Sequence, residues 1–477
     1  MTEATSSFTQ LAKPTGSIKR KVHIETWGCQ MNVADSERML ALLETQNYEL
    51  TGAGPESADL ILLNTCHIRE KARHKVLSRL GVLDDLKKKN PNLKIAVTGC
   101  VAQADGKKLL DLAPQIDVLL GPGKIDELPG LLAESSRSGA QSFAIGFDRH
   151  GSEDDKRTEQ QPLGAPVHIP SVSGKKEVTR FVNIIQGCNN FCTFCVVPFT
   201  RGREISRSMD EVLREVSHLV SEGAREITLL GQNVNSYGLD LLNTEDVPAD
   251  GGPFVDLLKA VASIPGLERL RFTTSNPHDF TKPLAQLFAT EPKMGRYMHL
   301  PVQAGNDRTL ERMKRKVTVK DYLERIGWLQ AAVPGIALST DIIVGFPGET
   351  EAEFEDTLRL LEQVRYSFVY AFKYSSRRGT AASRFVDQVP ESVKDSRLAR
   401  LNALQDQITL DLALADVGMS KDVLFIYESQ KLPGTWVGKT PEFRTVRVKS
   451  SDNLLGRTLP VRITGGNKIA LLGELLH

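Results

Sequence analysis

The sequence contains no apolar run long enough to span a membrane, and it lacks the features of a secretion signal. Residues 1–19 are rich in serine and threonine and have no apolar core segment, so we expect a disordered leader. The formal net charge is only +1, which excludes a globally basic protein and confines any nucleic-acid contact to local patches. These absences predict a cytoplasmic protein without a membrane anchor.

Cysteine is also scarce, because the 477 residues include only six, and these fall into two sets of three. The compact triplet, in one loop, is Cys188, Cys192 and Cys195. The dispersed triplet is Cys29, Cys66 and Cys100. Three thiolates can bind a cubic four-iron cluster while leaving one iron without a protein ligand. An open iron can bind a substrate or a cofactor, as the open position of a catalytic metal site does.

Other interpretations of the compact triplet are weaker. A bacterial ferredoxin run spaces its cysteines more closely and adds a fourth cysteine followed by proline. A structural zinc site normally needs four ligands, and the nearest candidate, His218, lies in a predicted helix beyond the loop. A disulfide framework does not suit a long chain without a secretion signal. Zinc remains the alternative to an open-iron cluster.

Each cysteine of the dispersed triplet closes a stretch with the pattern of a strand: residues 22–28, 59–65 and 93–99. Helical patterns at 35–46 and 68–89 separate these stretches, which predicts a parallel sheet with right-handed crossovers. All three cysteines would then emerge at the edge where open α/β sheets bind ligands. Taken singly, each would more often be a small buried side chain. His67 follows Cys66, either as a fourth ligand or as a loop residue beyond the strand.

The predicted fold class is α/β, with three folded units. Residues 20–133 form an N-terminal parallel-sheet domain, and 134–176 form a polar linker. Residues 177–410 repeat about six strand–helix units, which predicts a partial (βα)6 barrel rather than a closed one. Residues 411–477 have short alternating strands and turn residues, as in a small β-barrel.

The predicted strand ends of the central unit are unusually polar. Amide, hydroxyl and carboxyl groups there suit a ligand with ribose, purine and amino-acid parts. Each residue alone is more often a turn residue or a helix cap. The candidate cofactor-binding residues are Gln232, Asn233, Ser275, Gln303 and Asp341. The sequence assigns no catalytic side chain. Three guanidinium groups, at Arg201, Arg203 and Arg207, suit either an anionic ligand or a solvated loop.

The Cys-x3-Cys-x-Phe-Cys run of the compact triplet resembles the signature of radical S-adenosylmethionine enzymes. Residues 26–37 (TWGCQMNVADSE), 230–238 (LGQNVNSYG) and 299–307 (HLPVQAGND) resemble the methylthiotransferase family within that group. The likeness extends from Lys21 to the C-terminus and is greatest with the tRNA-modifying branch. The C-terminal barrel resembles a TRAM domain, an RNA-binding module.

The resemblance implies roles for these residues. The compact triplet would hold a 4Fe–4S cluster that binds and cleaves S-adenosylmethionine, and the dispersed triplet would hold an auxiliary 4Fe–4S cluster that carries the sulfur. Sulfur and methyl would be joined to C2 of N6-isopentenyladenosine next to the anticodon, at position 37 of the tRNA. The partners would be a tRNA anticodon loop and a reductant protein such as flavodoxin or ferredoxin, with the chain acting as a monomer. The RNA-binding residues expected on the barrel are Arg444, Arg447 and Lys449, beside Phe443.

Three alternatives remain open at this point. Sister enzymes of the family act on threonylcarbamoyladenosine in tRNA or on an aspartate of a ribosomal protein. A non-enzymatic alternative is an RNA-binding protein with two structural metal sites. It predicts about four ligands per metal and no cleavage of S-adenosylmethionine.

Overall fold

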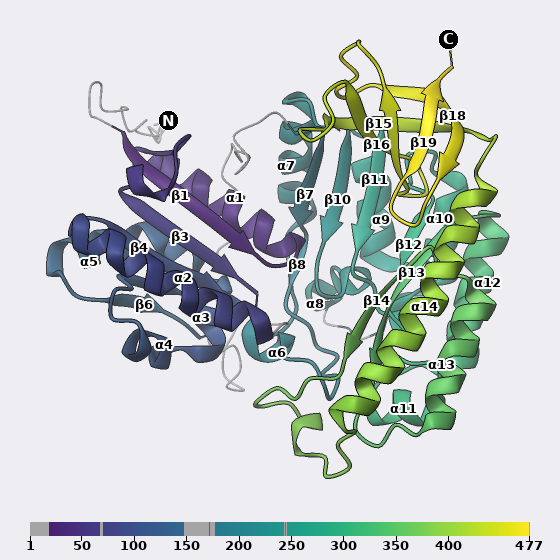
Figure 1. The fold of residues 1–477 in the computed structure, drawn as a ribbon, viewed down its shortest axis with the longest axis horizontal. Coiled ribbons are helices and arrows are strands. Elements are labelled where there is room, and N and C mark those ends of the chain that lie inside the picture. The colour runs from purple at the N-terminus through teal and green to yellow at the C-terminus, as the bar shows by residue number, and fades with distance from the viewer. Residues whose placement is uncertain are drawn as a thin grey trace, which may run out of the picture.

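The computed structural model describes residues 19–66, 70–146, 171, 177–242, 244 and 246–476. It contains an N-terminal sheet unit, a core of six parallel strands and a closed C-terminal barrel (Figure 1). None of the helices in these ranges is both long and apolar enough to cross a membrane. The predicted α/β class and its three kinds of unit are confirmed.

The N-terminal unit is a parallel sheet with the strand order β2-β1-β3-β4-β5-β6. Its strands are β1 (Arg20–Trp27), β2 (Tyr48–Leu50), β3 (Leu60–Thr65), β4 (Lys94–Gly99), β5 (Val118–Leu120) and β6 (Ser142–Ala144). Its helices are α1 (Gln30–Thr45), α2 (Glu70–Lys89), α3 (Cys100–Asp105), α4 (Lys107–Leu112) and α5 (Leu128–Ser138). Apolar side chains of β3 and β4 alternate between two core clusters, one on each face, because both faces are covered by helices.

The boundary predicted at residue 133 is wrong for this unit. Helix α5 continues to Ser138, and β6 pairs with β5 as the sixth strand of the sheet. Residues 134–144 therefore belong to the sheet unit rather than to a linker. The remainder of the predicted linker falls largely outside the described residues, as do His67 and residues 1–18 of the predicted leader.

The core consists of two three-stranded parallel sheets, ordered β11-β10-β7 and β12-β13-β14. The strands are β7 (Thr179–Asn183), β10 (Glu226–Leu230), β11 (Arg269–Thr273), β12 (Tyr297–His299), β13 (Ala337–Val344) and β14 (Phe368–Lys373). The longer helices around them are α7 (Met209–Ser221), α9 (Gly252–Ala262), α10 (Lys282–Thr290), α12 (Val319–Ala332), α13 (Glu351–Val364) and α14 (Glu391–Ala415). One continuous hydrophobic cluster joins these helices to both sheets, so six parallel strands form the predicted partial barrel.

The C-terminal unit is a closed barrel with the strand order β15-β16-β17-β19-β18. Its strands are β15 (Ser420–Glu428), β16 (Thr435–Lys439), β17 (Thr445–Lys449), β18 (Thr458–Gly466) and β19 (Leu471–Leu475). The predicted start at residue 411 lies inside α14, and the first barrel strand begins at Ser420. The β16–β17 loop contacts Arg269, the first residue of β11, through the carbonyl of Lys439 at 3.0 Å. The barrel therefore covers the N-terminal ends of the core strands.

Candidate functional site

The dispersed triplet lies at the carboxyl ends of three neighbouring strands. Trp27, Thr65 and Gly99, the last residues of β1, β3 and β4, pair with one another across the sheet. Cys29 then caps α1, and Cys100 opens α3. The Cys66 amide donates to the carbonyl of Trp27 at 2.9 Å, which fixes Cys66 beside the end of β1. The prediction that the three cysteines emerge at one edge of the sheet is confirmed.

Buried amide side chains connect the elements at this edge of the sheet by hydrogen bonds. The Asn32 side chain accepts from the Cys29 amide at 3.3 Å and donates to Asn64 at 3.0 Å. Asn64 donates in turn to Ser36 Oγ at 2.9 Å, which ties the start of α1 to β3. Gly99 has a φ of 88°, and a Cβ there would collide with the Asn64 side chain. Only glycine therefore fits the turn before Cys100.

A buried arginine of the core reaches the dispersed triplet. Arg201 Nη2 donates to Asp35 Oδ2 of α1 at 2.7 Å, and both residues are buried. A hydrogen bond with Cys66 and the positive charge of Arg201 lower the pKa of Cys29 to about 6, although burial opposes this. The thiolate is the metal-binding form of cysteine, so the charge of Arg201 favours ligation at this edge.

The compact triplet occupies the loop that follows β7 and the short strand β8 (Ile185–Gln186). The Cys188 amide donates to the Gly202 carbonyl at 3.1 Å, which closes the loop on its own continuation. Arg315 Nη1 lies 3.6 Å from the sulfur of Cys192. Burial raises the pKa of Cys188 and of Cys195 to about 12, so deprotonation of these thiols requires the positive charge of a bound metal.

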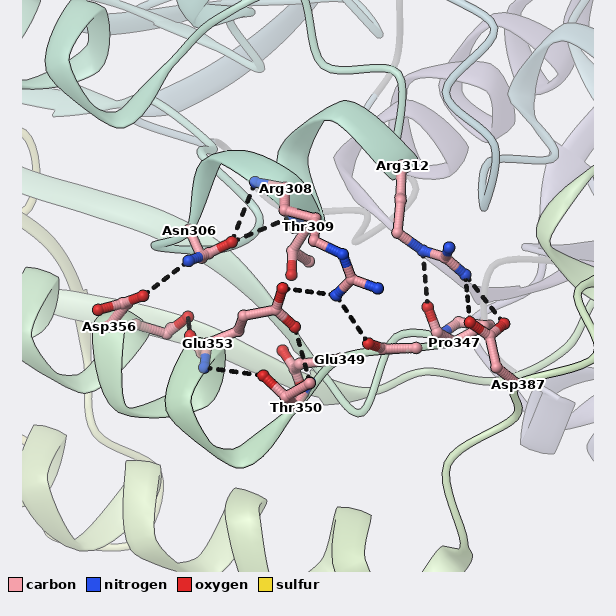
Figure 2. A network of polar contacts seen from close by, with 12 residues as sticks. Asn306, Arg308, Thr309, Arg312, Pro347, Glu349, Thr350, Glu353, Asp356 and Asp387 are labelled. Atoms are coloured by element: carbon pink, nitrogen blue, oxygen red, sulfur yellow. Dashed lines mark hydrogen bonds and ion pairs between the residues drawn. The ribbon is translucent and has the colours of Figure 1, made fainter.

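The loop of the compact triplet contacts Arg312, a residue of the polar network drawn in Figure 2. Thr193 donates its hydroxyl to the Arg312 carbonyl at 2.9 Å, at the end of α11 (Asp307–Arg312). Arg312 in turn binds Asp387 at 2.7 Å. The other members of the network, around the β13–α13 turn, are Asn306, Arg308, Pro347, Glu349, Thr350, Glu353 and Asp356. The loop is thus joined to α11, and through Arg312 to the segment that contains Asp387.

Two of the candidate cofactor-binding residues lie on the β10 side of the loop. Gln232 accepts a hydrogen bond from the amide of Gly187, directly before Cys188. Asn233 is buried and donates to Asp279 at 2.7 Å. Its neighbour Glu204 accepts from the Asn189 amide at 3.2 Å, and burial raises the pKa of this carboxyl to about 7.

Of the other three candidates, Ser275 and Gln303 follow β11 and β12, whereas Asp341 lies within β13 rather than at its end. The buried Ser275 hydroxyl has no hydrogen-bond partner among the described residues, so it can still bind a ligand. The Gln303 amide donates to the Asp341 carbonyl at 3.0 Å, which joins the segment after β12 to β13. Burial raises the pKa of Asp341 to about 7, and the charge of Arg315 opposes that shift. Among these contacts, the one that reaches the loop is that of Gln232 with Gly187, and Gln303 and Asp341 contact each other.

Sequence reasoning missed three contributors. Arg315 stands between two lysines, a pattern typical of solvated residues, and its contact with Cys192 has no signal in the sequence. Glu204 lies in an arginine-rich run, and no local pattern there distinguishes it from a solvated carboxylate. Asp35 looked like an ordinary helix residue, and its partner Arg201 is 166 positions away.

The arginine run itself divides into two kinds of residue. Arg201 and Arg207 are buried in ion pairs with Asp35 and with Glu215, the latter at 2.6 Å. Arg203 is exposed and lies over the ring of Phe191 at 4.7 Å. The solvated-loop interpretation is therefore wrong for two of the three guanidinium groups.

The barrel residues expected to bind RNA also differ among themselves. Arg447 and Lys449 are exposed on β17, whereas Arg444 pairs with Asp416 at 3.1 Å. The Phe443 ring packs against Tyr297, with 4.9 Å between the ring centroids, and against the Arg271 guanidinium. Phe443 therefore contacts the core as well as being partly exposed, and its place on an RNA face stays a prediction.

The donor sets suit clusters better than single metal ions. No three His, Cys, Asp or Glu side chains within the described ranges could together hold one metal ion. A structural zinc would need about four such ligands on a single atom. A four-iron cluster imposes a different geometry, because each thiolate binds its own iron. Each triplet supplies three free thiols, the number of donors that a four-iron cluster with one open iron needs.

Comparison with known proteins gives a consistent result. The uncharacterized protein family UPF0004 matches residues 21–121, and the radical SAM superfamily matches residues 182–361. The tRNA-2-methylthio-N(6)-dimethylallyladenosine synthase of Syntrophotalea carbinolica is 43% identical over 95% of this chain and 99% of its own. The enzyme of the same name from Bdellovibrio bacteriovorus is 41% identical over 100% of both chains.

Among solved structures, the chain is similar to the radical S-adenosylmethionine methyltransferase TsrM from Kitasatospora setae, which has cobalamin and a 4Fe-4S cluster bound. The TM-score is 0.54, with 14% identity over 77% of this chain and 74% of that one. This likeness concerns the fold alone.

Proposed function

The chain belongs to the family of tRNA-2-methylthio-N(6)-dimethylallyladenosine synthases, which are radical S-adenosylmethionine enzymes, and on that premise we propose its reaction. It joins sulfur and a methyl group to C2 of N6-isopentenyladenosine next to a tRNA anticodon, at position 37. Its cofactors are S-adenosylmethionine and 4Fe–4S clusters, as the family implies.

One observation carries the proposal: the two cysteine triplets face the same contact between the N-terminal sheet and the core. Asp35 lies on α1, the helix that Cys29 caps, and it binds Arg201. Gly202, which follows Arg201 in the chain, accepts a hydrogen bond from the Cys188 amide. A substrate base at this contact would have both triplets beside it. Such an arrangement suits a reaction that activates a carbon at one site and delivers sulfur from the other.

Each group of residues has a proposed role. Cys188, Cys192 and Cys195 hold one cluster, and Cys29, Cys66 and Cys100 hold the other. The cofactor is bound by Gln232, Asn233, Ser275, Gln303 and Asp341. When bound, the clusters and S-adenosylmethionine supply the electron, the hydrogen-abstracting radical, the sulfur and the methyl group. An aromatic C–H bond has no acidity for a side-chain base to exploit, so ordinary acid–base catalysis would not suffice.

Substrate capture uses unpaired bases, since loops expose base edges and stacking faces that a duplex hides. Phe368 and Tyr370 of β14 are both exposed, and their ring centroids are 4.6 Å apart. Tyr370 also packs against His299, whose Nε2 lies 3.6 Å from Asp341 Oδ1. This pair is a platform for a loop base next to the cofactor residues.

The barrel contributes phosphate contacts in the same proposal. Arg447 and Lys449, with Arg444 beside them, contact the RNA backbone. The barrel covers the N-terminal ends of the core strands, whereas the compact triplet follows a carboxyl end. The RNA stem would therefore lie along the core, with its loop reaching the cysteines. A reductant protein such as flavodoxin or ferredoxin, a cytoplasmic location and a monomeric state complete the proposal.

The test is anaerobic reconstitution of the full chain, followed by iron and sulfide analysis. We expect about eight irons per chain, from two four-iron clusters, together with reductive formation of 5′-deoxyadenosine. Bound zinc with no cleavage of S-adenosylmethionine would favour the RNA-binding alternative. Nucleoside analysis of tRNA from cells lacking the gene tests the substrate. Unchanged 2-methylthio adenosines would reject the tRNA assignment, and loss confined to threonylcarbamoyladenosine products would point to the sister reaction.

A further inference from the structure

Arg201 is joined by its main chain to the compact triplet. Its amide donates to the Val197 carbonyl at 2.8 Å, which ends the short helix after Cys195. Its own carbonyl accepts from Gln186 at 3.4 Å, and the following Gly202 carbonyl accepts from the Cys188 amide. The position of this segment is therefore set by the loop of the compact triplet.

The side chain of Arg201 points the other way, into the N-terminal unit. The residue is only 3% exposed, and its Nη2 donates to Asp35. Its positive charge interacts with the thiols of Cys29 and Cys100. Asp35 also accepts from Asn183 of β7 at 3.2 Å, so the carboxylate that orients the guanidinium is itself held by the core.

One polar atom of Arg201 is left over. Within the described residues, its buried Nη1 has no hydrogen-bond partner. An orphaned N–H of a buried guanidinium is unfavourable unless a ligand accepts from it. The acceptor that the surroundings offer is anionic sulfur, because the neighbouring ionisable groups include two thiols of the dispersed triplet.

A purely structural ion pair would not account for this arrangement. The same contact between the units already has a second buried pair, Arg180 with Glu37 at 3.4 Å. That pair joins the same helix, α1, to the core without involving the segment after the compact triplet. The two units are therefore already joined by one buried ion pair. Their docking does not require Arg201 to lie near the thiols, and it does not require the unpaired N–H of Nη1.

We propose that Arg201 is a positioning residue that bridges the two triplets and donates from Nη1 to a sulfur atom of the loaded dispersed triplet. The proposal rests on the proposed function, since it assumes that this triplet holds an iron–sulfur cluster. A hydrogen bond and a positive charge next to such a cluster stabilise its more negative, reduced form. Removing them lowers the reduction potential of that cluster.

The experiment uses the full-length chain in which Cys188, Cys192 and Cys195 are replaced by alanine, so that only the dispersed triplet can bind a cluster. Arg201→Gln, Arg201→Lys and the control Arg180→Gln are each introduced into this chain. After anaerobic reconstitution, iron is counted, and the midpoint potential is measured by a redox titration followed by electron paramagnetic resonance.

We expect the midpoint to shift to lower potential in Arg201→Gln and by a smaller amount in Arg201→Lys. The lysine keeps the positive charge but has one nitrogen in place of the two terminal nitrogens of the guanidinium, so it cannot reproduce the separate donation from Nη1. Arg180→Gln leaves the midpoint unchanged. A midpoint in Arg201→Lys equal to that of the parent overturns the proposal, even where Arg201→Gln fails to fold. A parent chain that binds no iron would instead reject the proposed function, so the two failures are distinguishable.

Discussion

At the scale of single residues, the two triplets differ in the charge that surrounds their thiols. A hydrogen bond with Cys66 and the charge of the buried Arg201 lower the pKa of Cys29, whereas burial raises the pKa of Cys188 and of Cys195. Loading of the compact triplet therefore depends more strongly on the charge of the incoming metal. Substitutions in the two triplets should separate their functions.

Cys66→Ala removes one of the two buried thiols of the dispersed triplet. We expect methylthiolation to be lost while cleavage of S-adenosylmethionine remains measurable, because the compact triplet is intact. Iron content should fall from about eight to about four per chain. Cys192→Ala is the matched control and should abolish cleavage itself. Loss of both activities in Cys66→Ala would instead indicate collapse of the N-terminal unit.

Asp341 should make the stability of the cofactor-free chain depend on pH. Burial raises the pKa of Asp341 to about 7, whereas an aspartate in the unfolded chain titrates near ~3.9. At a pH between these two pKa values, Asp341 is protonated in the folded chain and ionised in the unfolded chain. The free energy of unfolding therefore falls as the pH rises from about 4 to about 7. In Asp341→Asn this pH-dependent loss of folding stability should be absent, because the amide does not titrate.

The measurement is urea unfolding of both chains at pH 5 and pH 8. The stability advantage of Asp341→Asn should be about 2 kcal/mol greater at pH 8 than at pH 5. The exposed Asp256→Asn serves as the control and should show no such trend. An advantage that is equal at the two pH values would contradict the assignment.

At the scale of elements, the sequence predicts the strands best where they are buried on both faces. Residues 59–65 and 93–99 form continuous apolar runs, and β3 and β4 cover almost the same positions. The alternation of strands with helices predicted a parallel sheet. In a parallel sheet the carboxyl ends share one edge, so the sequence also predicted that Cys29, Cys66 and Cys100 lie at that edge. The edge of the same sheet was missed, because β6 has only three residues and α5 ends in polar residues such as Ser135 and Ser138. Such short elements show no periodicity of their own.

The candidate site was predictable only in its main-chain positions. The cysteines and the polar strand ends follow from the order of elements, but the side-chain pairings between units do not. Asp35 and Arg201 meet because α1 packs beside β7, a contact between surfaces that neither local pattern encodes (Figure 1). The same holds for Arg315 and Cys192, which lie 123 positions apart.

The turn before α13 should influence the compact triplet through the network of Figure 2. The Thr350 hydroxyl accepts from the Glu353 amide, and the Glu353 carboxylate accepts from the Thr350 amide at 2.7 Å. Glu353 also pairs with Arg308 of α11 at 2.6 Å. Thr350→Ala and Glu353→Ala each remove one half of this capping box, so each should destabilise the chain by about 1 kcal/mol.

Retention of iron by the compact triplet in the presence of a chelator distinguishes these two variants. Glu353→Ala should lose this iron faster, because α11 holds Thr193 of the cysteine loop. Thr350→Ala leaves the contact with α11 in place and serves as the control. Equal rates of loss would show that the network does not support the loop.

At the scale of the whole molecule, the barrel is held to the core by a buried cation. The Arg271 side chain donates to Glu226 and to the carbonyls of Thr440 and Pro441, each at 2.9 Å. Arg271→Met would leave the Glu226 carboxylate buried with a weaker partner. We expect a loss of about 3 kcal/mol in the free energy of unfolding and faster proteolysis at residues 416–419. The exposed Arg457→Met is the control. Proteolysis at the rate of the parent would show that other contacts suffice to dock the barrel.

The position of the barrel leads to a prediction about RNA. If the stem lies along the core and contacts the barrel while the loop reaches the cysteines, contacts on β17 should affect binding but not the chemical step. Replacing Arg447 and Lys449 with alanine removes two exposed charges from this strand. The slope of log affinity against log salt should therefore fall by about 2, and tRNA should bind more weakly at every salt concentration.

Filter binding over a salt series measures that slope, and single-turnover methylthiolation at saturating tRNA measures the chemical step. The chemical step should be unchanged, because the compact triplet follows the carboxyl end of β7, whereas the barrel covers the opposite ends of the core strands. Arg359→Ala, an exposed change on α13, controls for the loss of charge alone and should leave the slope unaltered. An unaltered slope in the double variant would move the RNA surface away from β17. A slower chemical step at saturation would mean that the barrel also orients the loop at the cysteines.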